Sequence, residues 1–163
     1  MDESWRRHLL ETDAAIDALL ARTRRIAVLG IKIRPEAPAY FVPEYLAAAG
    51  FDIVPVPVYY PEVTEILGRR VYRSLAQIPG PVDLVDVFRR PRDIPAHVED
   101  ILTKRPAAVW FQLGIRHDDV AEILARAGID VVQDRCLMVD ARRQGARGRR
   151  RDSGPALPPP PES

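Results

Sequence analysis

The sequence predicts an α/β protein with a three-layer, Rossmann-like, doubly wound fold around a mostly parallel sheet of five strands. Two observations carry this prediction. Short apolar runs alternate with segments of helical periodicity five times along the chain, and the connections between them are short. The apolar runs are continuous instead of alternating with polar residues, which is typical of parallel strands covered by helices on both faces. Right-handed crossovers would then place helices on either side of the sheet.

The chain opens with a segment of helical spacing. Residues 3–22 carry apolar side chains at intervals of three and four, and Arg22 and the arginines after it suit the negative end of a helix dipole. The segment predicts an amphipathic lead-in helix over 3–22 that covers part of the sheet.

The elements that follow form a core over residues 25–140. Buried strands are expected at 25–30, 52–56, 84–88, 107–114 and 129–133, read from the runs RIAVLG, DIVPV, LVDVF, AAVWFQLG and IDVVQ. Helices are expected from about 39 to Gly50, for about nine residues from Ile94 or Pro95, and over 117–127. Pro43 is expected in the first turn of its helix, where a missing N–H costs least.

The last segment has a different composition. Residues 142–163 are rich in Arg, Gly and Pro with almost nothing to bury, which predicts a disordered tail after a single domain of residues 1–141. No apolar stretch is long enough to span a membrane, and no secretory leader is seen. One cysteine, Cys136, excludes an internal disulfide framework. A cytoplasmic location is therefore expected.

Charge is unevenly distributed although the net charge is +1. The tail carries six arginines and two acids, which leaves the other 141 residues at about −3. A body of that charge is a poor general partner for nucleic acid, because phosphate contacts need a basic face. The body is therefore not expected to bind nucleic acid, and any such binding would fall to the tail alone. The sequence identifies no protein partner.

Ligands of open α/β sheets bind beyond the carboxyl ends of the strands, so the loops there are the candidate site. After the first strand, Gly30 permits a tight turn, Lys32 and Arg34 add two cations, and a helix N-terminus follows near Ala39 and Tyr40. Free N–H groups at a helix N-terminus favour a diphosphate. The same loop also fits a proline-stiffened connection with two solvated cations.

The residues present do not match the binding motifs for several other classes of ligand. The end of the second strand reads Pro57-Val58-Tyr59-Tyr60, without the acid that a nicotinamide dinucleotide site uses on its ribose. The nucleoside-triphosphate loop and the nucleophile elbow are absent, and the three histidines have no ligand partner at metal-site spacing. No catalytic group can be assigned to the ligand side.

Four blocks of the sequence resemble the stand-alone CoA-binding domain family, bacterial proteins related to the CoA-binding domain of the succinyl-CoA synthetase alpha subunit. The blocks begin at IAVLGIKIRPEAPAYFV, LGRRVYRSLAQIPGPVDLVDVFRRP, AAVWFQLGI and AGIDVVQDRCLMVD, and together they span about Arg25 to Asp140. The chain departs from the family at Ala39, where relatives usually carry serine, and in the turn after the second strand.

The resemblance implies that coenzyme A or a short acyl-CoA binds across the carboxyl ends of the strands. Its diphosphate would lie on the first loop, and the loops after the third and fourth strands would line the other side. The residues implied are Gly30, Ile31, Lys32, Ile33, Arg34, Pro35, Ala39, Tyr40, Val56, Phe88, Arg89, Arg90, Gln112, Leu113 and Gly114.

Some of these side chains have a structural alternative. Gln112 also fits a cap on nearby backbone groups, and Arg89 and Arg90 fit ion pairs with Asp83, Asp86 or Asp93. Neighbouring residues are expected in structural roles: Asp134 as a cap on the last helix, Cys136 as a half-buried packing thiol, and Trp110 in the core. Arg135 is expected over the first loop or the lead-in helix.

The expected function is therefore a non-catalytic module that binds coenzyme A. Two alternatives stay open at this point. One is a degenerate Rossmann domain that kept the fold as an interaction module without ligand, and the other is an NAD(P)-binding redox sensor.

Overall fold

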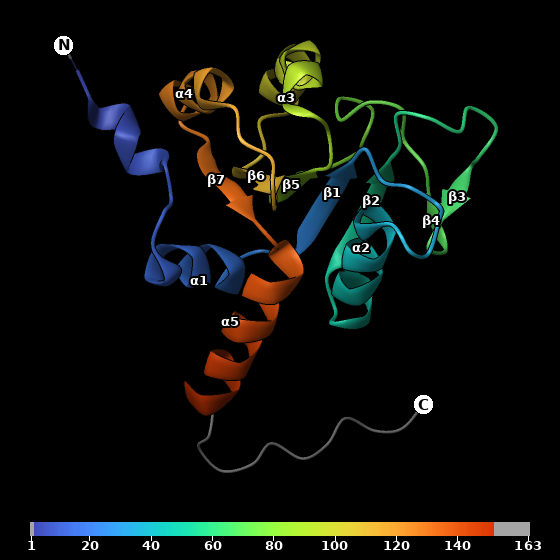
Figure 1. The fold of residues 1–163 in the computed structure, drawn as a ribbon, viewed down its shortest axis with the longest axis horizontal. Helices are drawn as coiled ribbons and strands as arrows, with labels where there is room; N and C mark the ends of the chain where they lie inside the picture. The colour runs from blue at the N-terminus through green and yellow to red at the C-terminus, as the bar shows by residue number, and fades with distance from the viewer. Residues whose placement is uncertain (1, 152–163) are drawn as a thin grey trace.

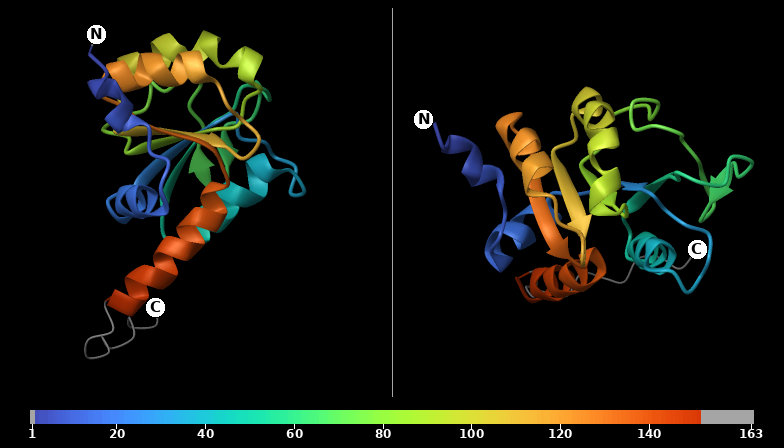
Figure 2. Two further views of the ribbon diagram at one scale, coloured as in Figure 1. Left: turned by 60° about the vertical axis from the view of Figure 1, so that its left-hand side comes forward. Right: turned by 45° about the horizontal axis from the view of Figure 1, so that its top comes forward.

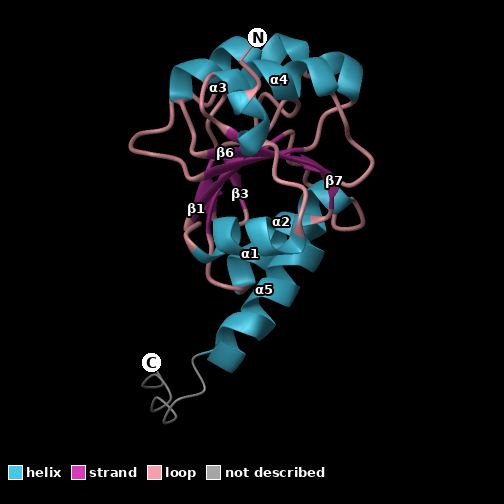
Figure 3. Cartoon of the chain, turned by 90° about the vertical axis from the view of Figure 1, so that its left-hand side faces the viewer, coloured by secondary structure: helices cyan, strands magenta, loops and turns pink. Residues whose placement is uncertain are grey.

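A computed structural model of the chain describes residues 2–151, with side chains through residue 146. Three layers are visible: a twisted sheet lies between helices α3 and α4 on one face and helices α1, α2 and α5 on the other (Figure 3). The predicted α/β class and three-layer architecture are confirmed.

The central sheet has five parallel strands in the order β2-β1-β5-β6-β7 (Figure 1). They are β1 (Arg25–Leu29), β2 (Asp52–Val56), β5 (Leu84–Val87), β6 (Ala108–Gln112) and β7 (Asp130–Arg135). The sequence did not predict the small antiparallel hairpin of β3 (Glu65–Ile66) and β4 (Arg69–Arg70), which lies beside β2.

Each face of the sheet has its own apolar cluster. Val85, Val87 and Phe111 pack against α3 and α4, and Val28 and Trp110 pack against α1, α2 and α5. The helices are α1 (Asp13–Ala21), α2 (Pro38–Ala48), α3 (Val98–Lys104), α4 (Asp118–Arg126) and α5 (Leu137–Arg151), with 3-10 turns η1 (Ser4–His8), η2 (Pro91–Asp93) and η3 (Pro95–His97). Burial on both faces explains why the strands read as unbroken apolar runs.

The predicted lead-in helix over 3–22 is wrong in its middle. The segment forms η1 and α1, and the residues between them run beside β7, where Leu10 donates its N–H to the Val131 carbonyl (2.9 Å). The Thr12 side chain then caps α1 by accepting from the Ala15 N–H (3.2 Å). This cap starts a new helix at Asp13.

The predicted disorder from residue 142 is also wrong in part, because α5 continues to Arg151 and runs away from the sheet (Figure 2). Arg143 lies against the body of the protein, where it pairs with Asp17 (2.7 Å) and with the buried Asp140. Arg135 joins Asp140 to Asp13 at 2.8 Å each. These ion pairs attach α5 to α1. Residues 152–163 of the expected tail lie outside the described residues.

Pro43 lies in the second turn of α2 instead of its first. A proline there cannot donate to the carbonyl four residues before it, which belongs to Ala39. That carbonyl accepts the Lys32 N–H instead (3.2 Å). The helix thereby holds the loop that follows β1. None of the described helices has the length and apolar character needed to cross a membrane.

Candidate functional site

A cleft of about 370 Å³ opens at the carboxyl ends of β1, β5 and β6. The chain leaves β1 toward β2 on one side and returns to β5 on the other, so the strand order reverses between β1 and β5. Ligands of doubly wound sheets bind at such a reversal. The lining residues are Lys32, Ala37, Pro38, Ala39, Phe88, Arg89, Arg90, Pro91, Gln112, Leu113, Gly114 and Ile115.

The N-terminus of α2 forms one wall. Its cap residue, Ala37, has no side chain to satisfy the first N–H groups, and Pro38 has no N–H at all. The Tyr40 N–H, expected to be free, bonds to the Ala37 carbonyl (2.8 Å). The Ala39 N–H makes no backbone hydrogen bond to any described residue, so it and the helix dipole remain for an anion.

Gly30 forms the floor between β1 and β5. Its φ of +89° is in the left-handed region, and a Cβ at this position would collide with the carbonyl group of Phe88. The glycine is therefore required by the approach of two loops of the protein itself, in addition to the tight turn and the ligand contact expected from the sequence.

The loop after β5 brings two arginines to the cleft in different settings. The Arg89 side chain is 15% exposed and donates through Nε to His97 Nε2 (3.2 Å), while Arg90 is 63% exposed and pairs with Asp93 (2.9 Å). Of the three carboxylates considered as their partners, only Asp93 pairs with them in the described part of the chain.

The loop after β6 forms the opposite wall. Gln112 is buried, and its side-chain oxygen accepts the Leu137 N–H at the start of α5 (3.4 Å), which favours the structural alternative for this residue. Asp134, expected to cap the last helix, instead accepts the Gly114 N–H (2.7 Å) and donates its own N–H to Ile115 (3.1 Å). Asp134 therefore holds the turn that lines the cleft.

Eight of the fifteen residues implied by the resemblance line the cleft, and Gly30 lies beneath it. Ile31 and Val56 are buried in the clusters on opposite faces of the sheet, and Tyr40 packs against the cluster that contains Ile31. Ile33, Arg34 and Pro35 are exposed and do not line the cleft. Arg34 pairs with Glu36 (2.8 Å), which offsets the charge expected to face a diphosphate.

Three residues that shape this region could not be identified from the sequence: Tyr59, His97 and, as the residue that holds the cleft turn, Asp134. Tyr59 is 54% exposed, and the Arg89 guanidinium lies 5.9 Å from its ring centroid. No sequence motif marks these residues, because each acts through a contact with a distant loop. Trp110 is in the core and Cys136 is half-buried, as expected, and Arg135 pairs with the first helix.

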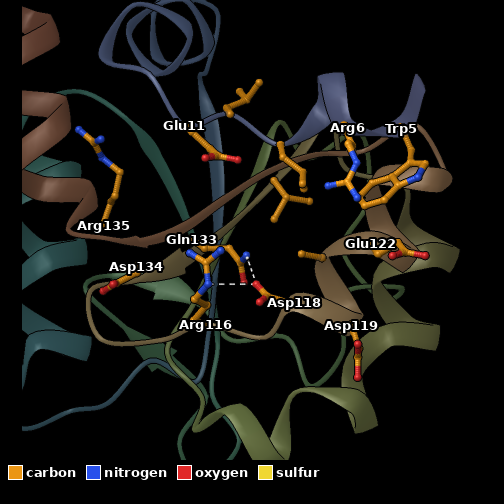
Figure 4. A pocket seen from close by; sticks show the side chains of 14 residues that line it. Trp5, Arg6, Glu11, Arg116, Asp118, Asp119, Glu122, Gln133, Asp134 and Arg135 are labelled. Atoms are coloured by element: carbon orange, nitrogen blue, oxygen red, sulfur yellow. Dashed lines mark hydrogen bonds and ion pairs between the residues drawn. The ribbon is translucent and has the colours of Figure 1, made fainter. Parts of the chain in front are cut away.

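A larger pocket of about 540 Å³ lies elsewhere, between η1, α4 and the outer edge of β7 (Figure 4). Several of its charged side chains have partners in or beside the pocket. Asp118 pairs with Arg116 (3.0 Å) and accepts from Gln133 (3.1 Å), and Glu122 pairs with Arg126 (2.9 Å). Five carboxylates line the larger pocket, whereas the cleft at the strand ends is lined by cations and no carboxylate, so the smaller cleft fits an anionic ligand better. Among the described residues, no three His, Cys, Asp or Glu side chains are placed to hold a metal ion.

One buried acid lies in β5, two residues before Phe88 of the cleft lining. Asp86 of β5 is fully buried, and neither of its carboxyl oxygens has a hydrogen-bond partner among the described residues. Burial raises the pKa of this carboxyl well above its ordinary value, so the neutral acid is favoured.

Comparison with known proteins gives a consistent result. Residues 24–142 match the model of the family described as CoA binding domain. The chain is 35% identical to the uncharacterized protein YneT of Bacillus subtilis over 126 residues, which covers 77% of this chain and 91% of YneT. A solved Thermus thermophilus structure is 40% identical with a TM-score of 0.76, covering 82% of this chain and 99% of that one. A hypothetical protein from Pyrococcus horikoshii is 34% identical with the same TM-score, covering 82% and 92%.

Proposed function

The chain belongs to the CoA binding domain family, and from that premise we propose that it binds coenzyme A or a short acyl-CoA through the ADP portion. The observation that carries this proposal is the composition of the cleft at the strand reversal. Lys32, Arg89 and Arg90 line it together with the N-terminus of α2, and the other lining residues are apolar or uncharged.

A cleft with cations and no carboxylate suits a ligand that is polyanionic at one end and weakly polar along the rest. Coenzyme A fits this description, because its phosphates carry all of its charge. The diphosphate would lie at the Ala39 N–H and Lys32, and Arg89 and Arg90 would take a phosphate from the opposite side. Gln112, Leu113 and Gly114 would border the uncharged part.

Discrimination against nicotinamide dinucleotides would come from the end of β2. A carboxylate there binds the adenosine ribose in dinucleotide sites. Here β2 ends at Val56 and runs into Pro57 and Val58, so no acid is available.

The proposed role is binding without catalysis. General acid–base and nucleophilic chemistry use carboxylate, imidazole, hydroxyl or thiol groups within hydrogen-bond reach of the substrate. The described lining of the cleft has none of these side chains. Reactions of the ligand would then be carried out by another protein.

Native mass spectrometry of the freshly purified protein tests the ligand class directly. A co-purified adduct with the mass of coenzyme A or an acyl-CoA is expected. An adduct with the mass of NAD or NADP would overturn the assignment in favour of a redox sensor.

A further inference from the structure

The guanidinium group of Arg89 is held on three sides. Its Nε–H donates to His97 Nε2 (3.2 Å), the Asp93 carboxylate lies 3.8 Å from Nη2, and the Tyr59 ring lies below at 5.9 Å. These partners come from the β2–β3 loop, η2 and η3, so separate segments converge on one side chain.

Arg89 differs in this respect from the other cations of the cleft. Its side chain is 15% exposed, against 63% for Arg90, and Lys32 is also exposed. An arginine that is already fixed loses less conformational entropy when it binds a phosphate, and partial burial reduces screening by solvent. Arg89 is therefore the cation best prepared to bind an anion.

The hydrogen bond defines the state of His97. Arginine has no acceptor atom, so His97 must accept through Nε2 and carry its proton on Nδ1. Burial, followed by the charge of Arg89, lowers the pKa of His97 below its ordinary value, while Asp100 and Asp93 act in the opposite direction. The neutral imidazole, which is the form that can accept, is favoured at neutral pH.

We infer that His97 is a positioning residue that holds the Arg89 guanidinium toward a phosphate group of the ligand. The inference rests on the proposed function for the identity of that ligand. His97 itself does not line the cleft. It acts through Arg89, because its Nε2 fixes the Nε–H of the guanidinium, while the N–H groups of Nη1 and Nη2 make no hydrogen bond to the described residues and remain for the ligand.

The test measures the affinity for coenzyme A by calorimetry in a set of variants. Arg89→Ala is expected to weaken binding about ten- to a hundredfold. His97→Ala should weaken it about three- to tenfold, since it removes only the positioning. His97→Gln, whose side-chain oxygen can take the place of Nε2, should bind nearly as well as the wild type.

Two comparisons separate positioning from a general loss of structure. The double variant Arg89→Ala with His97→Ala should bind no more weakly than Arg89→Ala alone, because His97 has nothing left to position. His8→Gln is the matched control, since His8 pairs with Asp130 (2.8 Å) and lies outside the cleft. It should leave the affinity unchanged even if the melting temperature falls.

Each outcome decides one point. If the wild type does not bind coenzyme A, the proposed function fails, and the positioning role with it. Suppose instead that the wild type binds coenzyme A and that Arg89→Ala lowers the affinity. The positioning role alone is then overturned in either of two cases: His97→Ala binds normally, or His97→Gln binds as weakly as His97→Ala. Should His97→Ala not fold, NMR of the wild type decides instead. The chemical shift of the Arg89 Nε–H must change as His97 titrates, and a chemical shift that stays constant through this titration overturns the inference.

Discussion

Gly30 and Phe88 meet at the floor of the cleft, where the glycine backbone lies directly against the Phe88 carbonyl and leaves no room for a Cβ atom. Gly30 also has a φ of +89°, which other residues adopt only with strain. The two loops that flank the strand reversal are thus in contact through their main chains. The cleft depends on this contact before any ligand is considered.

We expect Gly30→Ala to lower the free energy of unfolding by more than the φ strain alone, which costs about 1–3 kcal/mol. The additional loss would come from the collision with Phe88. Gly128→Ala is the matched control, because Gly128 has a φ of +84° but nothing within 4 Å of its Cβ position. Urea unfolding of both variants measures the difference, and equal losses would show that the contact with Phe88 is not tight.

Lys32 and Arg34 are neighbouring cations for which the structure predicts unequal roles. Lys32 lines the cleft, whereas Arg34 is exposed and paired with Glu36. Lys32→Ala should weaken the binding of coenzyme A about tenfold, as expected for a lost charge-assisted contact at an exposed site. Arg34→Ala should change it less than about twofold. Calorimetry at low salt makes the comparison, and a larger loss in Arg34→Ala would move the diphosphate to the outer part of the first loop.

The buried carboxyl of Asp86 predicts a pH-dependent stability. Because its pKa is raised in the folded state, the folded protein favours the protonated acid. Asp86 therefore costs no folding stability through ionisation below the ordinary pKa of aspartate, about 3.9. The loss of folding stability grows as the pH rises from there toward the raised pKa. Asp86→Asn has nearly the same size and does not titrate. Relative to the wild type, this variant should gain stability between pH 4 and pH 8, measured by urea unfolding.

Asp140→Asn is the control for this experiment. Asp140 is also buried, but it pairs with Arg135 and Arg143, so its loss should destabilise the protein at neutral pH. A stability difference between Asp86→Asn and the wild type that stays constant with pH would contradict the neutral state of Asp86.

The C-terminal helix should divide into a docked part and a dispensable part. Truncation after Gln144 keeps Arg143 with its partners Asp17 and Asp140, so the melting temperature should stay nearly constant. Arg143→Ala in the full chain should lower the free energy of unfolding by about 1–3 kcal/mol, because it breaks two partly buried ion pairs. Calorimetric melting compares them, and a larger effect of the truncation would mean that residues beyond 144 contribute to the fold.

The five strands could be predicted from the sequence because their signal is local. A run such as that of β1 is apolar after its first residue, Arg25, since both faces of the strand are covered. The lead-in segment was harder to predict from the sequence. The break between η1 and α1 comes from the pairing of Leu10 with Val131, which is a contact between distant segments. The helical part after residue 142 was missed for a similar reason: Arg143 appears as one more solvated arginine unless Asp17 and Asp140 are known to lie beside it.

The site was predicted at the level of loops but only partly at the level of side chains. Topology alone places the segments after β1, β5 and β6 at one edge of the sheet. Which cation faces the cleft depends on the partner that each side chain takes: Glu36, two residues further along, binds Arg34 outside the cleft, while His97 and Tyr59 fix Arg89 beside it. The sequence does not show which of the available partners a side chain takes.

Isothermal titration calorimetry of the wild-type protein with coenzyme A, and with NAD and NADP under identical conditions, tests the proposed ligand most directly. We predict saturable binding of coenzyme A that weakens as salt is raised, and no heat of binding with either dinucleotide. Absence of heat and of thermal stabilisation with millimolar coenzyme A would contradict the binding of coenzyme A. It would favour an interaction module that kept the fold without the ligand.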